Sequence, residues 1–468
     1  MNGGALNSNA EPATTPVYSA TNGGWNSGTG VFTPTSGDPS ATVTVGDFAS
    51  VFLDGATTPV FIARVTARTT TTVTVSTTVK VGTAPTTAGT GISINVGGAW
   101  LGPTGTVGFP FNFVTGALTN TALDNTRINF KNDQTYSITA AISTPSIDQG
   151  CFFQGYTSTF GDGGKATLTD SSAGASYVLL NMQYNFQSSV EDFIFDGNGT
   201  TGSADGVGAT RGFICRRCIF KNMRGNGING AFGSVPLQLI ECEAYGNNLS
   251  NTSGKGGIQS NIPLVCVRCY SHNNTGSNVR GFSSGAGCYI DCIAANNGAQ
   301  GFIIASNGNG LVMSGCDSYN NGGAGLESNN SNLTYVENCN FVKNGGYGVN
   351  FFSTLGRAAY FINCAFGSGT QANTSGTFNT TGSSRVEVDT VTLAANVTPW
   401  VDPANGDFTI NLAAVEGAGH GEFLQTVGSA GTSVGGTIGY PDIGAAQHQD
   451  TGGGGGTGIS RARGASGF

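Results

Sequence analysis

The sequence predicts an all-β protein whose central part is a solenoid of short strands. Composition is the first observation: 76 of the 468 residues are glycine, against a usual ~7 %, and 10 % are charged, against about 25 %. A sequence rich in Gly, Thr, Asn and Ser favours strands and turns over helices. The second observation is a repeat of 23 to 27 residues, and the third is a column of asparagines that keeps phase with it.

Charge and hydropathy exclude several classes of protein. With 38 % hydrophobic residues and a net charge of −8, the chain is too apolar to be disordered. The chain has 19 Lys and Arg and 27 Asp and Glu, so it has no net positive charge to attract a nucleic acid. A nucleic-acid-binding protein is therefore not expected. No segment reaches the ~18 apolar residues of a membrane-spanning helix, so we expect no membrane insertion. Residues 1–6 lack the basic start and apolar core of a secretory signal, so we expect no export by that route.

The first 100 residues are expected to form a small antiparallel β domain. Residues 41–55 and 60–82 alternate apolar and polar side chains and are separated by the turn Ala56-Thr57-Thr58-Pro59. A connector rich in Gly and Pro is expected to follow over residues 101–125.

Residues 126–385 are expected to form the solenoid. Seven cysteines in this region follow one another at intervals of 24, 27, 23, 24, 23 and 25 residues: Cys218, Cys242, Cys269, Cys292, Cys316, Cys339 and Cys364. At least one Asn stands four or five positions after each of the first six cysteines: Asn222, Asn247, Asn273, Asn296, Asn320 and Asn344. A period near 24 with short strands and Asn/Gly turns is that of a solenoid coil, because a propeller blade needs ~40 residues or more.

Side-chain alternation predicts which residues of each coil point inward. The cysteine and the residue two positions on are small or apolar and are expected inside, whereas the residues one and three positions on are expected to face water. The seven cysteines should therefore form a column in the core. An odd total of 11 cysteines at periodic positions fits buried free thiols better than disulfides, and such thiols suit folding in a reducing cytosol.

The repeated text resembles a known architecture. Segments such as CIFKNMRGNGI (218–228) and CIAANNGAQGF (292–302) resemble the coils of the right-handed parallel β-helix of the pectin-lyase-like superfamily. That resemblance implies a right-handed parallel β-helix over most of residues 126–385. After it we expect a C-terminal β cap over 386–450, which closes the open end of the solenoid, and a flexible Gly-rich arm over 451–468.

The informative surface is the outward side of the strand that follows each cysteine. Aromatic rings on a rigid sheet suit stacking against sugar rings, and carboxylates and His suit hydrogen bonding to hydroxyls. Tyrosine on an ordinary solvated strand is the competing interpretation. The residues predicted to contact a glycan are Glu243, Tyr245, Tyr270, His272, Asp317 and Tyr319.

Catalysis has less support in the sequence. Glu243 and Asp317 lie three coils apart, which is roughly 14 Å and too far for the paired carboxylates of a glycosidase. A Tyr245/His272 acid–base pair on adjacent coils is within geometric reach for a polysaccharide lyase. However, Ala295 fills the next place in that column, so no basic residue there neutralises a uronate. We assign no catalytic residue, no metal ligand and no cofactor.

The favoured function is a structural or appendage protein of a bacteriophage: a spike, a fibre or a capsid decoration. A β domain ahead of a β-helix resembles tailspikes, which implies docking to other virion proteins through the N-terminal domain or the C-terminal arm, and contact with host surface polysaccharide. The expected location is the virion, assembled in the host cytoplasm. Because few charges cover the lateral surface, we expect self-association, as a homotrimer.

Two alternatives stay open. The first is a secreted bacterial adhesin at the cell surface, because PDIGA (441–445) resembles the closing motif of bacterial β-helix surface proteins. The second is a polysaccharide lyase or glycoside hydrolase.

Overall fold

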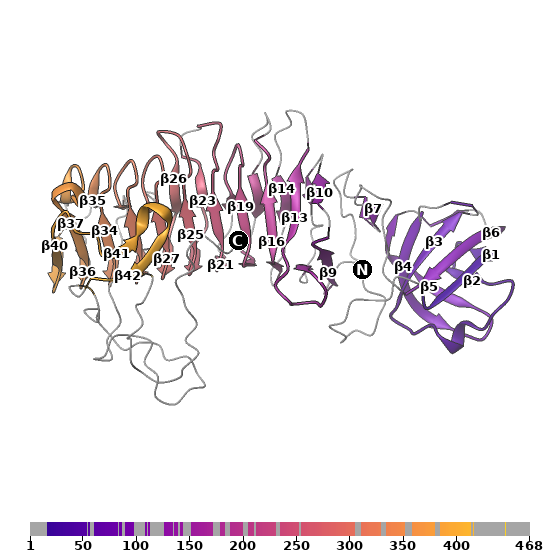
Figure 1. The fold of residues 1–468 in the computed structure, drawn as a ribbon. Helices are drawn as coiled ribbons and strands as arrows, with labels where there is room; N and C mark the ends of the chain where they lie inside the picture. Colours follow the sequence, from indigo (N-terminus) through magenta and orange to yellow (C-terminus); the bar gives the residue numbers. More distant parts are fainter. Residues whose placement is uncertain are drawn as a thin grey trace. The chain divides into compact units, whose positions relative to one another are not determined.

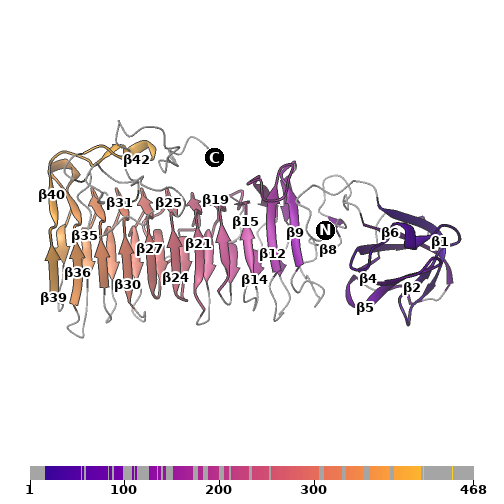
Figure 2. The same ribbon diagram turned by 90° about the horizontal axis from the view of Figure 1, so that it is seen from below.

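The computed structural model describes residues 16–412 with gaps, together with Val415 and Ala445; the gaps are 54, 57–59, 83, 87–88, 98–107, 110, 113–125, 134, 139–140, 144–150, 172–177, 183–187, 200–204, 210–211, 231–234, 252–253, 305–309, 329–333, 352–357 and 380–383. The chain divides into two compact units, Met1–Cys218 and Ile219–Phe468. Figures 1 and 2 show the fold in two orientations. The predicted arm at 451–468 lies outside the described residues.

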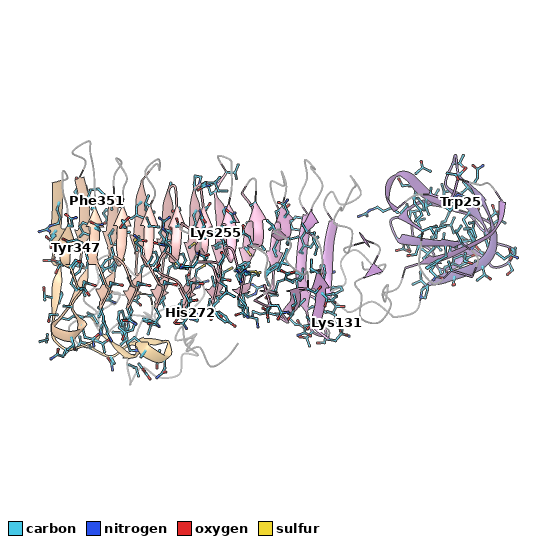
Figure 3. The ribbon with its side chains drawn as sticks, turned by 90° about the horizontal axis from the view of Figure 1, so that it is seen from above. Trp25, Lys131, Lys255, His272, Tyr347 and Phe351 are labelled. Carbon is cyan, nitrogen blue, oxygen red and sulfur yellow. The ribbon has the colours of Figure 1, made fainter. Side chains whose placement is uncertain are left out.

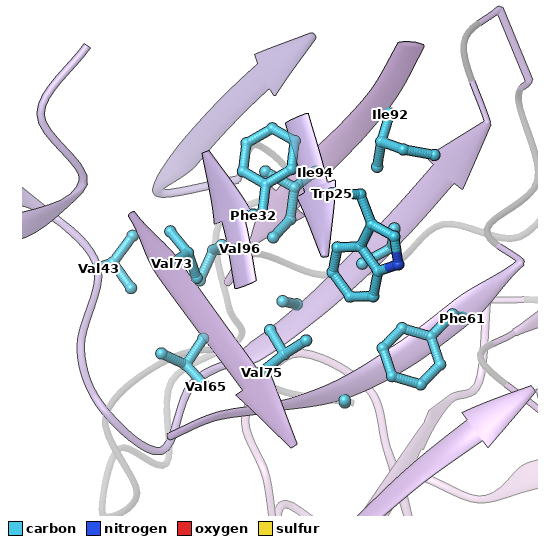
Figure 4. Packing of buried hydrophobic residues seen from close by; sticks show 13 residues of the cluster. Trp25, Phe32, Val43, Phe61, Val65, Val73, Val75, Ile92, Ile94 and Val96 are labelled. Atoms are coloured by element: carbon cyan, nitrogen blue, oxygen red, sulfur yellow. The ribbon is translucent and has the colours of Figure 1, made fainter. Parts of the chain in front are cut away.

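The N-terminal unit begins with a closed antiparallel barrel, in which the strands run in the order β1-β2-β5-β4-β3-β6. Alternating Val, Ile and Phe side chains fill its interior around Trp25 and Phe32, as Figure 4 shows. A short 3-10 turn, η1 (Pro39–Ala41), precedes β3. This barrel confirms the predicted small antiparallel domain; its strands are β1 (Tyr18–Asn26), β2 (Val31–Thr33), β3 (Phe48–Leu53), β4 (Phe61–Arg68), β5 (Val73–Gly82) and β6 (Gly89–Val96).

Little of the predicted connector is described. It contains the short antiparallel pair β7 (Gly108–Phe109) and β8 (Phe111–Asn112).

From residue 126 onward the strands pair parallel with the strand three places later, so that every coil contributes one strand to each of three sheets. This is the predicted parallel β-helix. Sheet I, which follows the cysteine column, contains β10 (Thr135–Ile138), β13 (Ala166–Asp170), β16 (Phe193–Asp196), β19 (Ile219–Lys221), β22 (Glu243–Tyr245), β25 (Tyr270–His272), β28 (Ile293–Ala295), β31 (Asp317–Tyr319), β34 (Asn340–Val342), β37 (Ala365–Ser368) and β40 (Val391–Ala395).

The other two sheets complete each coil. Sheet II contains β11 (Ile142–Ser143), β14 (Val178–Met182), β17 (Asp205–Ala209), β20 (Ile228–Gly230), β23 (Gly256–Ser260), β26 (Arg280–Ser284), β29 (Phe302–Ile304), β32 (Leu326–Ser328), β35 (Tyr347–Phe351) and β38 (Gly376–Asn379). Sheet III contains β9 (Thr126–Lys131), β12 (Cys151–Tyr156), β15 (Ser189–Glu191), β18 (Ile214–Arg216), β21 (Leu237–Ile240), β24 (Leu264–Val267), β27 (Gly287–Ile290), β30 (Leu311–Ser314), β33 (Thr334–Glu337), β36 (Ala358–Ile362) and β39 (Ser384–Val388).

The cysteine column lies inside the coils, as predicted. All seven of its members are at most 1 % exposed, and the ten described cysteines are free thiols. The residue two positions after each cysteine is also buried, as with Phe220, Ala244 and Ser271. Burial raises the pKa of the Cys292 and Cys316 thiols, which keeps them protonated and unreactive.

Left-handed backbone positions make the corners of the coils. The residue just before the cysteine column has a φ between 51° and 55° in Arg217, Glu241, Arg268 and Asp291. A second corner ends the strands of sheet I, where Asn296 and Asn320 have φ values of 55° and 50°. Asn tolerates this conformation better than most residues, which accounts for part of the Asn column.

The end of the solenoid differs from the prediction. Strands β39 and β40 pair parallel with β36 and β37, so the ladder continues to Ala395, beyond the expected boundary at 385. Arg385 and Glu387 stand in register with the inward residues Ala359 and Phe361, and they form an ion pair of 2.6 Å. Inward-pointing charges on a last strand block further strand addition. This ion pair, on the last strand of sheet III, protects the open end.

Of the cap predicted over 386–450, the residues after 412 lie outside the described residues, apart from Val415 and Ala445. The hairpin of β41 (Trp400–Asp402) and β42 (Asp407–Ile410), with η5 (Pro403–Asn405) between them, folds back over the outward side of sheet I. Trp400, Phe408 and Ile410 pack there against Tyr319 and Val342. Another 3-10 turn, η4 (Gly369–Gln371), follows β37.

Candidate functional site

The outward side of sheet I was expected to face water, but four of the six predicted residues are buried: Glu243, His272, Asp317 and Tyr319. Asp317 is 0 % exposed and Tyr319 is 4 % exposed. The cause is the C-terminal hairpin, whose Trp400 and Phe408 rings meet the Tyr319 ring edge-on at 5.5 and 6.1 Å. The apolar outward residues Ala295 and Val342 lie under the same cover.

Asp317 anchors this cover through hydrogen bonds. Its Oδ2 accepts from the backbone N–H of Ala445 at 3.0 Å, although the two residues are 128 positions apart, and its Oδ1 accepts from Asn340 Nδ2 at 2.8 Å. Burial raises the pKa of Asp317 to about 7. Ala445 is the last residue of the PDIGA segment, so this motif ends at a buried carboxylate on the face of the β-helix. Asp317 and Tyr319 therefore hold the C-terminal segment and are not free to contact a glycan.

The other four predicted residues come together at β22 and β25. Figure 3 labels His272 among them. His272 Nε2 and Glu243 Oε1 are 2.8 Å apart, and both side chains are about nine-tenths buried or more, with exposures of 10 % and 8 %. The imidazole stacks on Tyr270 at 3.9 Å between ring centroids and on Tyr245 at 5.2 Å. Strand register explains this cluster, because Tyr245 stands opposite His272 and Glu243 stands opposite Tyr270.

Hydrogen bonding fixes the role of each atom in this cluster. Asn273 Nδ2 lies 3.0 Å from His272 Nδ1; when the amide donates, Nε2 is left to donate to Glu243. Glu243 Oε2 is buried and has no hydrogen-bond partner among the described residues. A buried carboxylate oxygen without a donor is a position where a ligand hydroxyl can bind.

Tyr270 is half-buried and in contact with the carboxylate. Burial and, to a smaller extent, the charge of Glu243 raise the pKa of its phenol well above the usual value. The hydroxyl therefore stays protonated at neutral pH and can donate to a ligand, but it cannot act as a general base there. Tyr245 is likewise half-buried, so both rings keep an accessible part.

Lys221 is the residue that the sequence prediction missed. It stands opposite Tyr245 on the preceding strand, β19, in the same outward column as His272. The prediction considered only the following coil, where Ala295 occupies the column. The same rule, by which the residue three positions after a column cysteine points outward, identifies Lys221 when it is applied to Cys218, the cysteine one coil before Cys242. We call the group Lys221, Glu243, Tyr245, Tyr270 and His272 the aromatic site.

Other kinds of site have no support among the described residues. They contain no group of three or more His, Cys, Asp or Glu placed to hold a metal ion. In that same part of the chain, no helix is long and apolar enough to span a bilayer.

No family model matches the chain, and no curated protein matches it. Among solved structures, the mannuronan C-5 epimerase AlgE4 A-module of Azotobacter vinelandii is similar at 12 % identity, with a TM-score of 0.35, covering 57 % of this chain and 85 % of that one. Pectate lyase Pel9A matches at 11 % identity, with a TM-score of 0.35, over 70 % of this chain and 87 % of its own.

A viral protein is among the similar structures. ORF18 of Geobacillus virus E2 is 15 % identical, with a TM-score of 0.37, over 57 % of this chain and 54 % of that one. At such low identities and TM-scores, none of these similarities bears on function, which has to be inferred from the residues of the aromatic site and from the fold.

Proposed function

We propose that the chain is a structural appendage protein of a bacterial virus and that it contacts host surface saccharides through the aromatic site. The observation that supports the viral role best is a β-helix core of free thiols in a chain that begins with a separate β-barrel. Free thiols buried in a rigid core suit a protein that folds in a reducing cytosol, as proteins of a bacterial virus do before release.

The chemistry of the aromatic site supports saccharide contact. The half-buried Tyr245 ring offers a surface for stacking against a pyranose, whereas the Tyr270 ring already packs against His272 and Phe408. The Tyr270 hydroxyl and Glu243 Oε2 offer one donor and one acceptor to sugar hydroxyls. Lys221 adds a positive charge one strand away. Acidic polysaccharide, with a carboxylate directed at Lys221, is therefore the class of glycan that fits this site best.

Glycan binding by the purified chain tests this proposal. Acidic and neutral capsule-type polysaccharides are immobilised, and binding of the wild-type chain is compared with that of Tyr245→Ala and of a matched control, Tyr347→Ala. Tyr347 is a half-buried tyrosine on sheet II, away from the aromatic site. We expect Tyr245→Ala to weaken binding at least tenfold, because stacking on an aromatic ring is lost, and Tyr347→Ala to leave it unchanged.

Two outcomes would contradict the proposal. One is equal binding by wild type and Tyr245→Ala; the other is no binding by the wild-type chain to any of the polysaccharides.

A polysaccharide lyase is the second candidate, because the paired His272 and Glu243 lie beside two tyrosines. The same polysaccharides are incubated with the wild-type chain and assayed for unsaturated products. A time-dependent signal that His272→Ala abolishes would favour the lyase over a binding role.

A further inference from the structure

The three sheets of the later coils present three different outward surfaces. Sheet I is covered by the C-terminal hairpin. Sheet II presents a polar column of aligned residues, interrupted only by the buried Ile303: Asn229, Gln259, Ser283, Glu327, Asn350 and Asn379. Sheet III differs from both, because its outward side chains are mainly apolar.

Two outward columns run along sheet III from β21 to β39. Register places Gln238, Val265, Cys288, Val312, Tyr335, Tyr360 and Val386 in one column. It places Ile240, Val267, Ile290, Ser314, Glu337, Ile362 and Val388 in the other. These side chains are half-buried or exposed. The exposed fractions of Val312, Val386 and Val388 are 46, 39 and 42 %. We call these two columns the sheet III face.

The sheet III face is flat and almost without charge. The strand pairs from β21 to β39 keep one register without bulges. From β21 to β36 the described outward positions carry one carboxylate, Glu337, and no Lys or Arg. That carboxylate already accepts from Ser314 Oγ at 2.9 Å and from the Tyr335 hydroxyl at 3.0 Å. The ion pair of Glu241 and Arg268 lies at the edge of the face.

The sheet III face is complementary to a partner surface that is itself flat, apolar and uncharged. An anionic membrane or a nucleic acid would need cations on this face, and a glycan would need more hydrogen-bonding groups. An apolar centre with a polar rim is the composition of a protein–protein interface, and parallel sheets are normally covered on both sides. We infer that the sheet III face binds the same face of a second copy of this chain.

The sheet III face is small for a protein–protein interface. Six steps of ~4.8 Å and four-residue strands of ~13 Å give a flat area of roughly 380 Å² for each copy. That is about half of the ~800 Å² that each partner buries in a stable interface of standard size. The expected association is therefore weaker than that of an interface of standard size. It involves a different sheet from the aromatic site and does not depend on glycan contact.

Analytical ultracentrifugation of the full chain across nanomolar to tens of micromolar concentrations tests this inference. We expect a concentration-dependent dimer, because pairing of identical faces closes with twofold symmetry. We also expect at least tenfold weaker association for Val312→Lys, which places a charge at an exposed position of the face. The matched control is Val45→Lys, a Val that is 54 % exposed in the N-terminal unit; it should associate as the wild type does. Thermal unfolding of each variant checks that it is folded.

A second measurement needs no substitution. Cys288 is the described thiol that is only half-buried, and it lies in the sheet III face. Its rate of maleimide labelling should fall severalfold as the wild-type chain is concentrated through the association range. A monomer at every concentration would overturn the inference, and so would unchanged association of Val312→Lys together with a constant labelling rate.

Discussion

At the residue scale, the protonation state of Asp317 affects how firmly the C-terminal segment packs on sheet I. Its carboxylate is fully buried beneath the hairpin and Ala445, and this burial is the main cause of its raised pKa. The negative charge of Asp291 raises the pKa further. Lys343 of the neighbouring strand region lies over the Tyr319 ring instead, at 5.9 Å from its centroid. Burial therefore favours the protonated, neutral form of Asp317 over the ionised form.

The stability of the covered state should depend on pH through this residue. When the hairpin is released, Asp317 loses its proton near its ordinary value of 3.8, whereas in the covered state it keeps the proton up to about 7. Covering is thus favoured most below pH ~4 and weakens as the pH rises from about 4 to about 7. Hydrogen exchange of residues 400–410, measured from pH 4 to 8 and corrected for intrinsic rates, should report this loss of protection.

The Asp317→Asn variant is the control for that experiment. Its side chain has a similar shape and does not ionise, so protection of the hairpin should vary less with pH than in the wild type. The same pH dependence in both proteins would show that Asp317 is not the group responsible.

Single residues also show where sequence reasoning succeeds and fails. Cys292 and Ala294 were placed correctly inside, because a residue and its second neighbour share one side of a strand whatever surrounds the sheet. Tyr319 was placed wrongly in water, because the residues that cover it, Trp400 and Phe408, lie some 80 positions later and follow no repeat. Local periodicity determines the side of a strand but not what covers it.

At the scale of elements, a ladder of buried asparagine amides ties successive coils together. The amides of Asn274, Asn297, Asn321 and Asn344 donate in turn to the next side-chain oxygen at 2.8, 2.9, 3.0 and 2.9 Å, ending at Asn373. Each amide also donates to a backbone carbonyl of the preceding coil, as Asn297 does to Ser271 at 3.0 Å. The predicted Asn column is thus two columns, one at the left-handed corners and one in the core.

Removing one amide from the buried column should cost more than removing a corner asparagine. Asn297→Ala removes four hydrogen bonds: those from its amide to the Ser271 carbonyl and to Asn321 Oδ1, and those that its Oδ1 accepts from the amide and the backbone N–H of Asn274. Each contributes a net ~0.5–1.5 kcal/mol. We expect a loss of about 2–4 kcal/mol in the free energy of unfolding, measured by urea denaturation. The neighbouring corner variant Asn296→Gly, which keeps the left-handed backbone, should lose less than about 1 kcal/mol.

Comparable losses in the two variants would mean that the ladder does not contribute to stability beyond the corner conformation.

The elements themselves were largely predictable, and their ends were not. The cysteine period predicts one strand of sheet I in each coil, because the same residue types return at the same corner. Strands β39 and β40 were assigned to the cap and not to the solenoid, since the last coil replaces the inward apolar pair by Arg385 and Glu387. A terminal coil has to end the core, so its sequence departs from the repeat.

At the scale of the whole molecule, the features of the chain serve different tasks. The barrel has its own core around Trp25 and Phe32. In the later coils, sheet I presents the aromatic site beside its covered part, and sheet III presents the apolar face. The barrel, the β-helix and the sheet III face that we propose for self-association fit the proposed role as an assembled appendage.

The most direct test of this account is to locate the chain on virus particles. Antibodies raised against the barrel and against the β-helix are applied to purified particles of the virus, or induced prophage, whose genome encodes the chain, and the particles are imaged by electron microscopy. The account predicts that both antibodies label intact particles at a fixed position and that the chain co-purifies with them in constant proportion. Label absent from every particle, with the chain recovered only from the medium or the bacterial surface, would contradict it.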